Sequence, residues 1–416
     1  MGEKVEKIDV NIYPAKGGDA FLIKFPNKKN IVIDMGYKDT YYDYIKNDFE
    51  SIQNDTQCIN LLIITHIDED HIEGAIQFIK ENCYSDKPKI VGVSEVWHNS
   101  YRHLQISKEG NLTSEDQETA ILEEVKKSNS VSRIKEINES KEVSTFQGST
   151  LASYLYVYNY SWNESFYGLA VSVDNKYDNN IDGISIKILS PNTSKLKSLS
   201  RKWLSFLKGK KYNFKITDDK IFDDAYEFYV KNIEDFEINE EKLVSSKNIE
   251  DSIELLKDIK ASKTDASASN GSSIAFELIY ENTKMLFLGD CHEDVLIDYF
   301  NKDINSKVHY DLIKLPHHGS LRNNSNWINF VKAKYYIFST DGINHDEHPS
   351  IELISKIICN NKESQKKIFL VFNYNITIVE KFEDKSLKDL YNYDIIYPGS
   401  GKKVNIQLGE DSINGI

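Results

Sequence analysis

Several features that would assign a chain of 416 residues to a particular class are absent from this sequence. No apolar run approaches the roughly 18 residues that a membrane-spanning helix needs, so we expect no transmembrane segment and no membrane partner. The N-terminus begins with Met1-Gly2 and the charged residues Glu3 and Lys4, and no apolar targeting core follows. We therefore expect no export signal.

Cysteine is scarce, and its distribution excludes a disulfide scaffold. The four cysteines, Cys58, Cys83, Cys291 and Cys359, are scattered along the chain, and no Cys-x-x-Cys pair occurs. Small secreted domains held by disulfides use closely spaced cysteines instead. Together with the missing export signal, this pattern predicts a protein of the reducing cytoplasm.

An excess of basic residues is also missing. The chain has 51 lysines and arginines against 65 aspartates and glutamates, a net charge of −14. This balance argues against sequence-independent nucleic-acid binding through a broad basic patch. It does not exclude a metal-dependent nuclease, because bound metal ions can themselves hold phosphate.

What the sequence does contain is a sizeable apolar fraction and one dense polar cluster. Hydrophobic residues make up 40% of the chain, enough for a large core, and the length predicts one domain with insertions or two domains. The apolar run Leu-Leu-Ile-Ile at 61–64 predicts a buried strand. The metal-capable side chains that follow it are His66, Asp68, Asp70 and His71.

Imidazole and carboxylate groups at this density suit zinc, manganese or iron. His66 and Asp68 alternate onto one side of an extended loop, whereas Asp70 and His71 point elsewhere, so one short turn can serve two adjacent metals. Gly74 permits close packing of a helix that we expect to begin around Ile72. The alternative is a solvated turn in which an aspartate caps that helix.

The loop resembles the metallo-β-lactamase signature His-x-His-x-Asp-His, with Asp68 in place of the second histidine. This variant is similar to the metallohydrolase domain of bacterial competence DNA-uptake proteins and of phosphocholine esterases. Further matches cover roughly residues 8–100 and 180–350. The resemblance implies an α+β fold, an αββα sandwich of two mostly antiparallel sheets with helices outside and metal ligands at one edge.

The first half of the chain supplies further candidates by this resemblance. The opening hairpins at 8–36 contain Gly-Asp-Ala and Ile-Asp-x-Gly, and Asp34 would support the metal loop from behind; the alternative is an ordinary turn aspartate. His98 follows a predicted strand at 90–97, where the fold completes its first metal site. His103 is a close alternative.

The second half supplies the remaining candidates. Asp290, after a predicted strand at 284–288, resembles the carboxylate that bridges two metals, because one oxygen can face each cation. The Pro-His-His-Gly-Ser motif at 316–320 places His317 and His318 side by side, so at most one is expected to bind a given metal. The other would hydrogen-bond a phosphate oxygen or protonate a leaving group. His348 stands where the last metal histidine is expected, with His345 as the fallback.

Two segments do not match the core. Residues 104–180 and 193–268 are predicted insertions within a domain spanning 1–360, and 361–416 is predicted to be a C-terminal β-rich extension. In the first insertion we expect a helix from Ser114 and a strand at 155–160. In the second we expect helices near 223–229 and 249–256, then a loop at 261–269. These insertions could wall the active site or bind a partner; they could equally be neutral to function.

The resulting hypothesis is a hydrolase that uses two divalent metal ions, zinc or manganese, to activate water. The oxygen-rich site favours manganese slightly. The expected substrate is a phosphodiester in nucleic acid or a nucleotide. The first metal would be held by His66, Asp68 and His98, the second by Asp70, His71 and His348, with Asp290 between them; Asp70, His317 and His318 are the expected catalytic residues.

Other functions stay open from the sequence. The chain could be a regulatory or partner-dependent component of a multi-protein system, such as an antiphage defence effector. It could also hydrolyse another class of ester, because this fold hosts several chemistries. A degenerate binding module is less consistent with so complete a ligand set.

A first prediction concerns the thiols. Because the cysteines are scattered and a reducing compartment is expected, Cys58, Cys83, Cys291 and Cys359 should all be free. Alkylation of the denatured, non-reduced protein followed by mass spectrometry should label all four. A native disulfide between any two of them would contradict the expected compartment.

Overall fold

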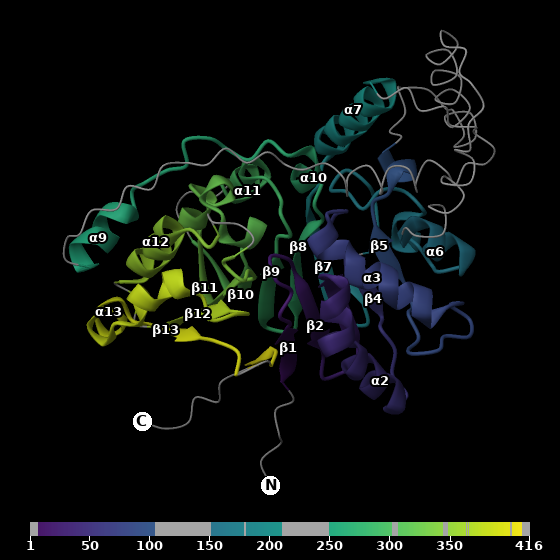
Figure 1. The fold of residues 1–416 in the computed structure, drawn as a ribbon, viewed down its shortest axis with the longest axis horizontal. Helices are drawn as coiled ribbons and strands as arrows, with labels where there is room; N and C mark the ends of the chain where they lie inside the picture. The colour runs from purple at the N-terminus through teal and green to yellow at the C-terminus, as the bar shows by residue number, and fades with distance from the viewer. Residues whose placement is uncertain are drawn as a thin grey trace.

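The computed structural model describes residues 7–104, 151–209 and 249–409, apart from 179, 302–306, 344–347, 363, 365 and 400–401. The expected helices at Ser114 and near 223–229, and the fallback ligand His345, lie outside these residues. Two sheets form the centre of the molecule (Figure 1). The first has six strands in the order β14-β1-β2-β3-β4-β5, and the second has eight in the order β13-β12-β11-β10-β9-β8-β7-β6.

The strands are β1 (Ile8–Ile12), β2 (Ala20–Lys24), β3 (Asn30–Met35), β4 (Leu61–Ile64), β5 (Val96–His98), β6 (Asn180–Ile181), β7 (Ile184–Ser190), β8 (Ala275–Tyr280), β9 (Thr283–Phe287), β10 (Val308–Lys314), β11 (Val331–Phe338), β12 (Ile368–Phe372), β13 (Tyr393–Ile396) and β14 (Val404–Leu408). The helices are α1 (Lys38–Thr40), α2 (Lys46–Asn54), α3 (Glu69–Asn82), α6 (Leu151–Val157), α7 (Thr193–Gly209), α9 (Ile249–Leu256), α10 (Ala268–Gly271), α11 (Glu293–Phe300), α12 (Ile351–Asn361) and α13 (Lys385–Tyr391). A π-helical turn (Tyr41–Ile45) joins α1 to α2, and short 3-10 helices span Tyr101–Leu104, Glu164–Phe166, His317–Gly319, Leu321–Asn323, Trp327–Phe330 and Thr377–Glu383. Among the described helices, none is long and apolar enough to cross a membrane.

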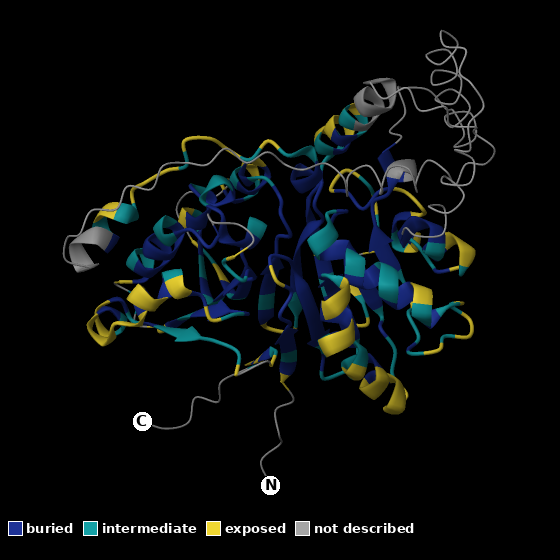
Figure 2. Ribbon diagram, viewed as in Figure 1, coloured by how far each residue is buried: buried dark blue, intermediate teal, exposed yellow. Residues whose placement is uncertain are grey.

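The layers follow from the alternation of side chains along the strands. On β4, Leu61 and Ile63 join the apolar cluster between the two sheets, whereas Leu62 and Ile64 face α2, α3 and α6. A third cluster packs the second sheet against α9, α11, α12 and α13. Figure 2 shows the buried sheets at the centre and exposed residues on the outer helices. The predicted αββα sandwich is confirmed by this arrangement.

The strand directions correct one detail of the prediction. The sheets are mixed rather than mostly antiparallel: β3, β4 and β5 are parallel to one another, and β9 through β13 are also parallel. Parallel neighbours need a long crossover, and helices supply it, for example α3 between β4 and β5 and α12 between β11 and β12. The C-terminal segment contributes to both sheets, because β12 and β13 extend the second and β14 pairs with β1 in the first.

Two predicted strands are wrong or too long. Residues 155–160 are not a strand: α6 ends at Val157, its Leu151 and Leu155 are buried against the core, and Tyr154 stacks on Tyr158 four residues later. The strand expected at 90–97 is reduced to β5, because the side-chain oxygen of Asn82 accepts hydrogen bonds from the backbone amides of Ile90 and Val91.

The parallel strands bring the polar segments of both halves to one edge of the sandwich. The loops that follow β4, β5, β9 and β10 all leave from the same ends of their strands. The two sheets are joined there by hydrogen bonds, from the Ile274 amide to the Thr65 carbonyl (2.8 Å) and from the Ser339 hydroxyl to the Gly18 carbonyl (2.7 Å). The candidate site therefore lies at this edge, where the loops of both sheets meet.

A second prediction tests how α3 is held at this edge. A Cβ atom added to Gly74 would lie 2.2 Å from the carbonyl oxygen of Met35 on β3. Without that clash, Gly→Ala within a helix would stabilise the protein by up to about 1 kcal/mol. We expect Gly74→Ala instead to lower the free energy of unfolding by about 1–3 kcal/mol, the usual cost of overpacking.

The matched control is Gly92→Ala, whose added Cβ would meet only Cys58 Cβ, at 3.4 Å. Urea denaturation of both variants measures the difference. A Gly74→Ala protein more stable than the wild type would contradict the close packing of α3 on β3.

Candidate metal centre

The loop after β4 enters α3 earlier than the sequence predicts. Asp68 has an extended backbone and precedes the helix, which begins at Glu69 rather than near Ile72. Asp70 and His71 therefore lie in the first turn of α3, whereas His66 and Asp68 lie on the extended approach to it. Gly18 allows the opening hairpin to come close, since a Cβ there would be 1.8 Å from the Asp70 carbonyl oxygen.

Asp34 fixes this loop from behind. Its carboxylate is fully buried and accepts hydrogen bonds from the Thr65 amide (2.7 Å) and the Thr65 hydroxyl (2.7 Å). The same carboxylate lies 2.8 Å from His71 Nδ1. One aspartate thus holds both the end of β4 and a ring in the first turn of α3.

The histidine rings are held so that Nε2 points into the site. His71 Nδ1 faces Asp34, His318 Nδ1 lies 2.8 Å from the Ser339 carbonyl, and His66 Nδ1 lies 3.1 Å from the Thr65 hydroxyl. The Nε2 atoms of His66 and His71 are buried and have no hydrogen-bond partner among the described residues. In metal-binding histidines, one ring nitrogen is typically hydrogen-bonded to the protein and the other is available to the metal.

These Nε2 atoms converge on one oxygen of Asp290. The distances to Asp290 Oδ2 are 3.3 Å from His318, 3.7 Å from His71, 3.9 Å from His66 and 4.0 Å from His317. Asp290 thus lies at the centre of histidines from both halves of the fold.

The two carboxylates of the loop after β4, Asp68 and Asp70, lie beside different histidine rings. Asp68 Oδ2 lies 3.4 Å from His66 Nε2, on one side of the cluster. Asp70 Oδ2 lies 3.7 Å from His71 Nε2 and 3.5 Å from His318 Nε2, on the other. The expected division into two adjacent subsites is compatible with this geometry.

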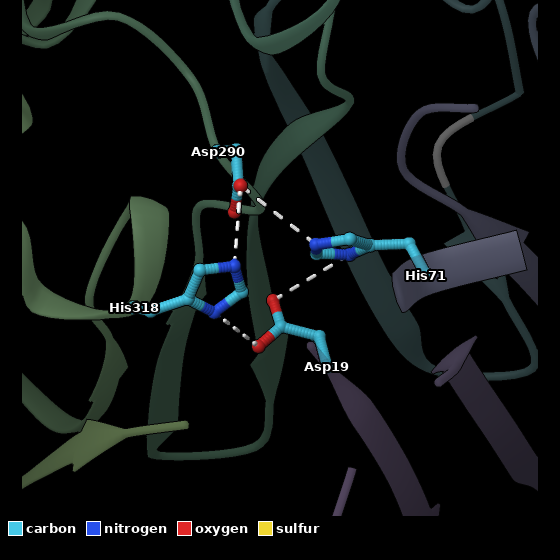
Figure 3. A group of neighbouring side chains, drawn as sticks. All are labelled: Asp19, His71, Asp290 and His318. Atoms are coloured by element: carbon cyan, nitrogen blue, oxygen red, sulfur yellow. Dashed lines mark ion pairs between the residues drawn. The ribbon is translucent and has the colours of Figure 1, made fainter. Parts of the chain in front are cut away.

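Asp19 belongs to the back of the cluster. It lies 3.9 Å from Nδ1 of His71 and 3.7 Å from Nδ1 of His318, so it faces the opposite edges of the rings that face Asp290 (Figure 3). It forms a buried ion pair with Lys314, whose ammonium also donates to the Gly289 carbonyl (3.0 Å). Asp19, His71, Asp290 and His318 form a group of buried ligand-type atoms within 4.8 Å of one another.

The electrostatics show that the cluster favours positive charge. Burial opposes ionisation of Asp290, but the imidazoles of His318 and His71 outweigh it and hold the carboxyl pKa well below its usual range. Burial likewise opposes charge on His71, but Asp70, Asp290 and Asp34 raise its pKa to about 10. A buried cluster that favours positive charge so strongly, and that offers oxygen and nitrogen donors, is suited to divalent metal ions. On binding, such ions would displace the protons that the imidazoles otherwise carry.

The structure places His98 and His103 around one tryptophan of the first insertion. The His98 ring is fully buried and stacks on Trp162 with 6.0 Å between centroids, and Trp162 Nε1 donates to the His98 carbonyl (2.8 Å). His103 meets Trp162 edge-on at 4.9 Å between ring centroids, and its Nδ1 accepts a hydrogen bond from the Ser100 amide. His98 pairs with Ile64 of β4, near His66, so its role as a ligand stays a prediction.

His317 and His348 lie on the outer side of the cluster. His317 and His318 both have positive φ angles, and their rings diverge with 5.7 Å between centroids and 60° between planes. The buried ring of His348 lies 4.7 Å from that of His317 and 5.9 Å from that of His318. His348 is thus near the site, but the short contacts with Asp70 and Asp290 are made by His318.

Sequence reasoning missed several residues of this centre. Asp19 and Lys314 lie within recognised motifs, and an isolated lysine at the end of an apolar strand is a signal that could have identified the ion pair. Ser269 donates to Asp68 Oδ1 (2.6 Å), and Asp265 lies 3.6 Å from His317 Nδ1. Both lie within 261–269, which was expected to be a loop of an insertion that could wall the active site, bind a partner or be neutral to function; Ser269 instead lies in α10.

Comparison with known proteins does not identify a function for this chain. No protein family model matches the chain, and no curated protein matches it. A solved structure, the metallo-beta-lactamase fold protein YhfI from Bacillus subtilis, aligns over 96% of this chain and 100% of its own, with 9% identity and a TM-score of 0.36. Because that overlap is loose, the fold assignment depends on the sheets and layers described above.

A third prediction concerns metal content. Because Asp70 and Asp290 face several unpartnered or charged imidazoles, Asp70→Ala and Asp290→Ala should lower metal affinity by at least about tenfold to a hundredfold, the effect typical of lost supporting residues. Elemental analysis of purified protein should find close to two transition-metal ions per chain in the wild type and fewer in both variants.

Asp394→Ala is the matched control, since Asp394 is an ion-paired aspartate on β13, away from the cluster. It should keep the wild-type metal content. A wild-type protein that binds no metal under any reconstitution would contradict the assignment of this centre.

Proposed function

We propose that this chain is a metal-dependent hydrolase that cleaves phosphodiesters in nucleic acid or in a nucleotide. The observation that carries the proposal is the convergence of four histidine Nε2 atoms within 4.0 Å of Asp290 Oδ2. In the proposed site, the Asp290 carboxylate would contribute to holding both divalent ions. His66, Asp68 and His98 would hold the first; Asp70, His71 and His318 would hold the second.

This ligand set replaces His348 by His318 in the second subsite. The reason is geometric: His318 Nε2 lies 3.5 Å from Asp70 and 3.3 Å from Asp290, and its Nδ1 is held by a backbone carbonyl. His348 remains the alternative ligand from the sequence. The three carboxylates among the ligands favour a hard ion such as manganese, and the imidazoles also suit zinc, so we propose one of these two metals.

Two bound divalent ions supply Lewis acidity for water and neutralise charge on the phosphoryl group. The protein supplies orientation and proton transfer. His317 lies next to the cluster and is used by neither proposed subsite, and its Nε2 lies 4.0 Å from Asp290 Oδ2. It is therefore the best candidate to protonate the leaving oxygen. The choice of a phosphodiester is supported by the likeness of the two histidine motifs to competence-type hydrolase domains.

A partner-dependent form of this activity is the second candidate. Several large apolar side chains of the first insertion are exposed, among them Tyr167 (80%), Leu169 (54%) and Val157 (54%). Exposed apolar side chains that are contiguous are typical of a protein interaction surface, so these residues are the candidates for one. Activity of the purified protein, measured with and without the cell extract in which it is expressed, separates an independent hydrolase from one that needs a partner.

A fourth prediction separates ligand from proton donor in the histidine pair. His318→Ala should lose metal and rate together, because His318 contacts two ligand carboxylates. His317→Ala should keep its metals and lose roughly a hundredfold to ten-thousandfold in rate on a natural diester, the contribution typical of general acid catalysis. Elemental analysis and rates on DNA, RNA and bis-nitrophenyl phosphate measure both effects.

The loss in His317→Ala should be smaller on bis-nitrophenyl phosphate, because nitrophenolate leaves without a proton. Two results would overturn the proposal: a wild-type protein with full metal content that cleaves no diester, or two variants with full metal and full rate.

A further inference from the structure

The loop between α9 and α10 brings a carboxylate, Asp265, to the outer side of His317. Its side chain is only 9% exposed, and Asp265 Oδ2 lies 3.6 Å from His317 Nδ1. The same oxygen accepts a 3.0 Å hydrogen bond from the side-chain amide of Asn323, and Asn323 Oδ1 lies 3.0 Å from His317 Nδ1. His317, Asn323 and Asp265, which is more than fifty residues earlier in the chain, thus form a closed triangle beside the metal centre.

The chemistry of this triangle determines which nitrogen of His317 carries a proton. An ionised carboxylate only accepts hydrogen bonds, so the NH₂ end of Asn323 must face Asp265. The backbone carbonyl of Cys291 accepts from the same NH₂ group at 3.1 Å, which fixes the amide from a second direction. Asn323 Oδ1 is then an acceptor facing the ring, and His317 Nδ1 must be the donor.

The charged form of Asp265 is maintained by its surroundings. Burial opposes ionisation, but the neighbouring His317 and His292, with the Asn323 amide, lower the pKa of the carboxyl. The Ser267 amide donates to Asp265 Oδ1 (2.8 Å), and His292 Nε2 lies 3.8 Å from that oxygen. Asn270 donates to Oδ2 at 2.9 Å. Because these contacts hold the Asp265 carboxylate in place, the side-chain amide of Asn323 has one orientation.

We infer that Asp265 and Asn323 are positioning residues that fix the Nδ1–H tautomer of His317 and leave Nε2 as the atom presented to the metal centre. His71 and His318 are held in the same way, because their Nδ1 atoms face Asp34 and the Ser339 carbonyl. In His317 the corresponding contact is supplied by a loop outside the matched motifs. The catalytic consequence rests on the proposed function: with its first proton held on Nδ1, His317 takes up a second proton on Nε2 from solvent, and the resulting imidazolium gives that proton from Nε2 to the leaving oxygen. The tautomer itself does not depend on that function.

The direct test is nuclear magnetic resonance of the full-length, zinc-loaded protein with ¹⁵N-labelled histidine rings. The His317 signals are assigned by their loss in His317→Gln. The wild type should show a single His317 tautomer with the proton on Nδ1. In Asp265→Asn the new side chain can donate, so Asn323 can turn its NH₂ towards the ring and the Nε2–H tautomer should appear.

Two further variants keep the test decisive. Asp265→Glu retains a carboxylate and should restore the wild-type tautomer, whereas Asp265→Ala should mix the two. Asp394→Asn, which removes an ion-paired aspartate on β13, should leave the His317 signals unchanged. An unchanged Nδ1–H pattern in both Asp265→Asn and Asp265→Ala would overturn the inference.

Kinetics supply the second readout. In Asp265→Asn, kcat on a diester with a poor leaving group should fall about tenfold to a hundredfold, as for other residues that orient an active-site histidine. KM should stay within about twofold, because substrate binding is not removed. Metal content should also stay unchanged, unlike in His318→Ala. If no diester is cleaved by the wild type while the tautomer changes as expected, the proposed function fails and the positioning role stands.

Discussion

The contact of four imidazole Nε2 atoms with one oxygen of Asp290 is the interaction on which the rest of the site depends. His66 and His71 belong to the first sheet and its helix, whereas His317 and His318 belong to the second. They meet because β4 and β10 are both members of parallel strand groups whose ends lie at the same edge. Asp290 follows β9, at the same edge, where a single carboxylate can serve both sides.

The supporting residues explain how so many charged groups stay buried together. A charge removed from water is tolerated only when it is paired and hydrogen-bonded. Lys314 pairs with Asp19 and lies 3.7 Å from the other oxygen of Asp290. Asp34 and Ser339 hold the far nitrogens of two rings. The contacts of Asp34 and Ser339 turn the Nε2 atoms of His71 and His318 inwards, so contacts that stabilise the fold also set the direction of the ligand atoms.

The sequence predicted the parts of this structure that local patterns encode. The apolar run before His66, the strands around Asp290 and the helix at 249–256 all appear where their periodicity places them. The strand expected at 155–160 failed because aromatic residues suit both strands and helices, and packing of Leu155 on the core favoured the helix. Asp19 and Asp265 could not be assigned roles, because each acts through residues far along the chain. The sequence left open which of His317 and His318 binds metal, because the directions of the two rings follow from a backbone turn with two positive φ angles, and this turn cannot be read from the residue types of the motif.

The most direct test of the central claim is anomalous diffraction from crystals of the protein grown with manganese or zinc. We expect two anomalous peaks on either side of Asp290. One should lie within about 2.0–2.2 Å of the Nε2 atoms of His71 and His318, and the other at about the same distance from His66 Nε2. Each peak should lie beside one oxygen of Asp68 or Asp70. A fully loaded crystal with no peak within reach of Asp290, and with the four histidines still facing its carboxylate, would contradict the assignment of this cluster as a metal centre.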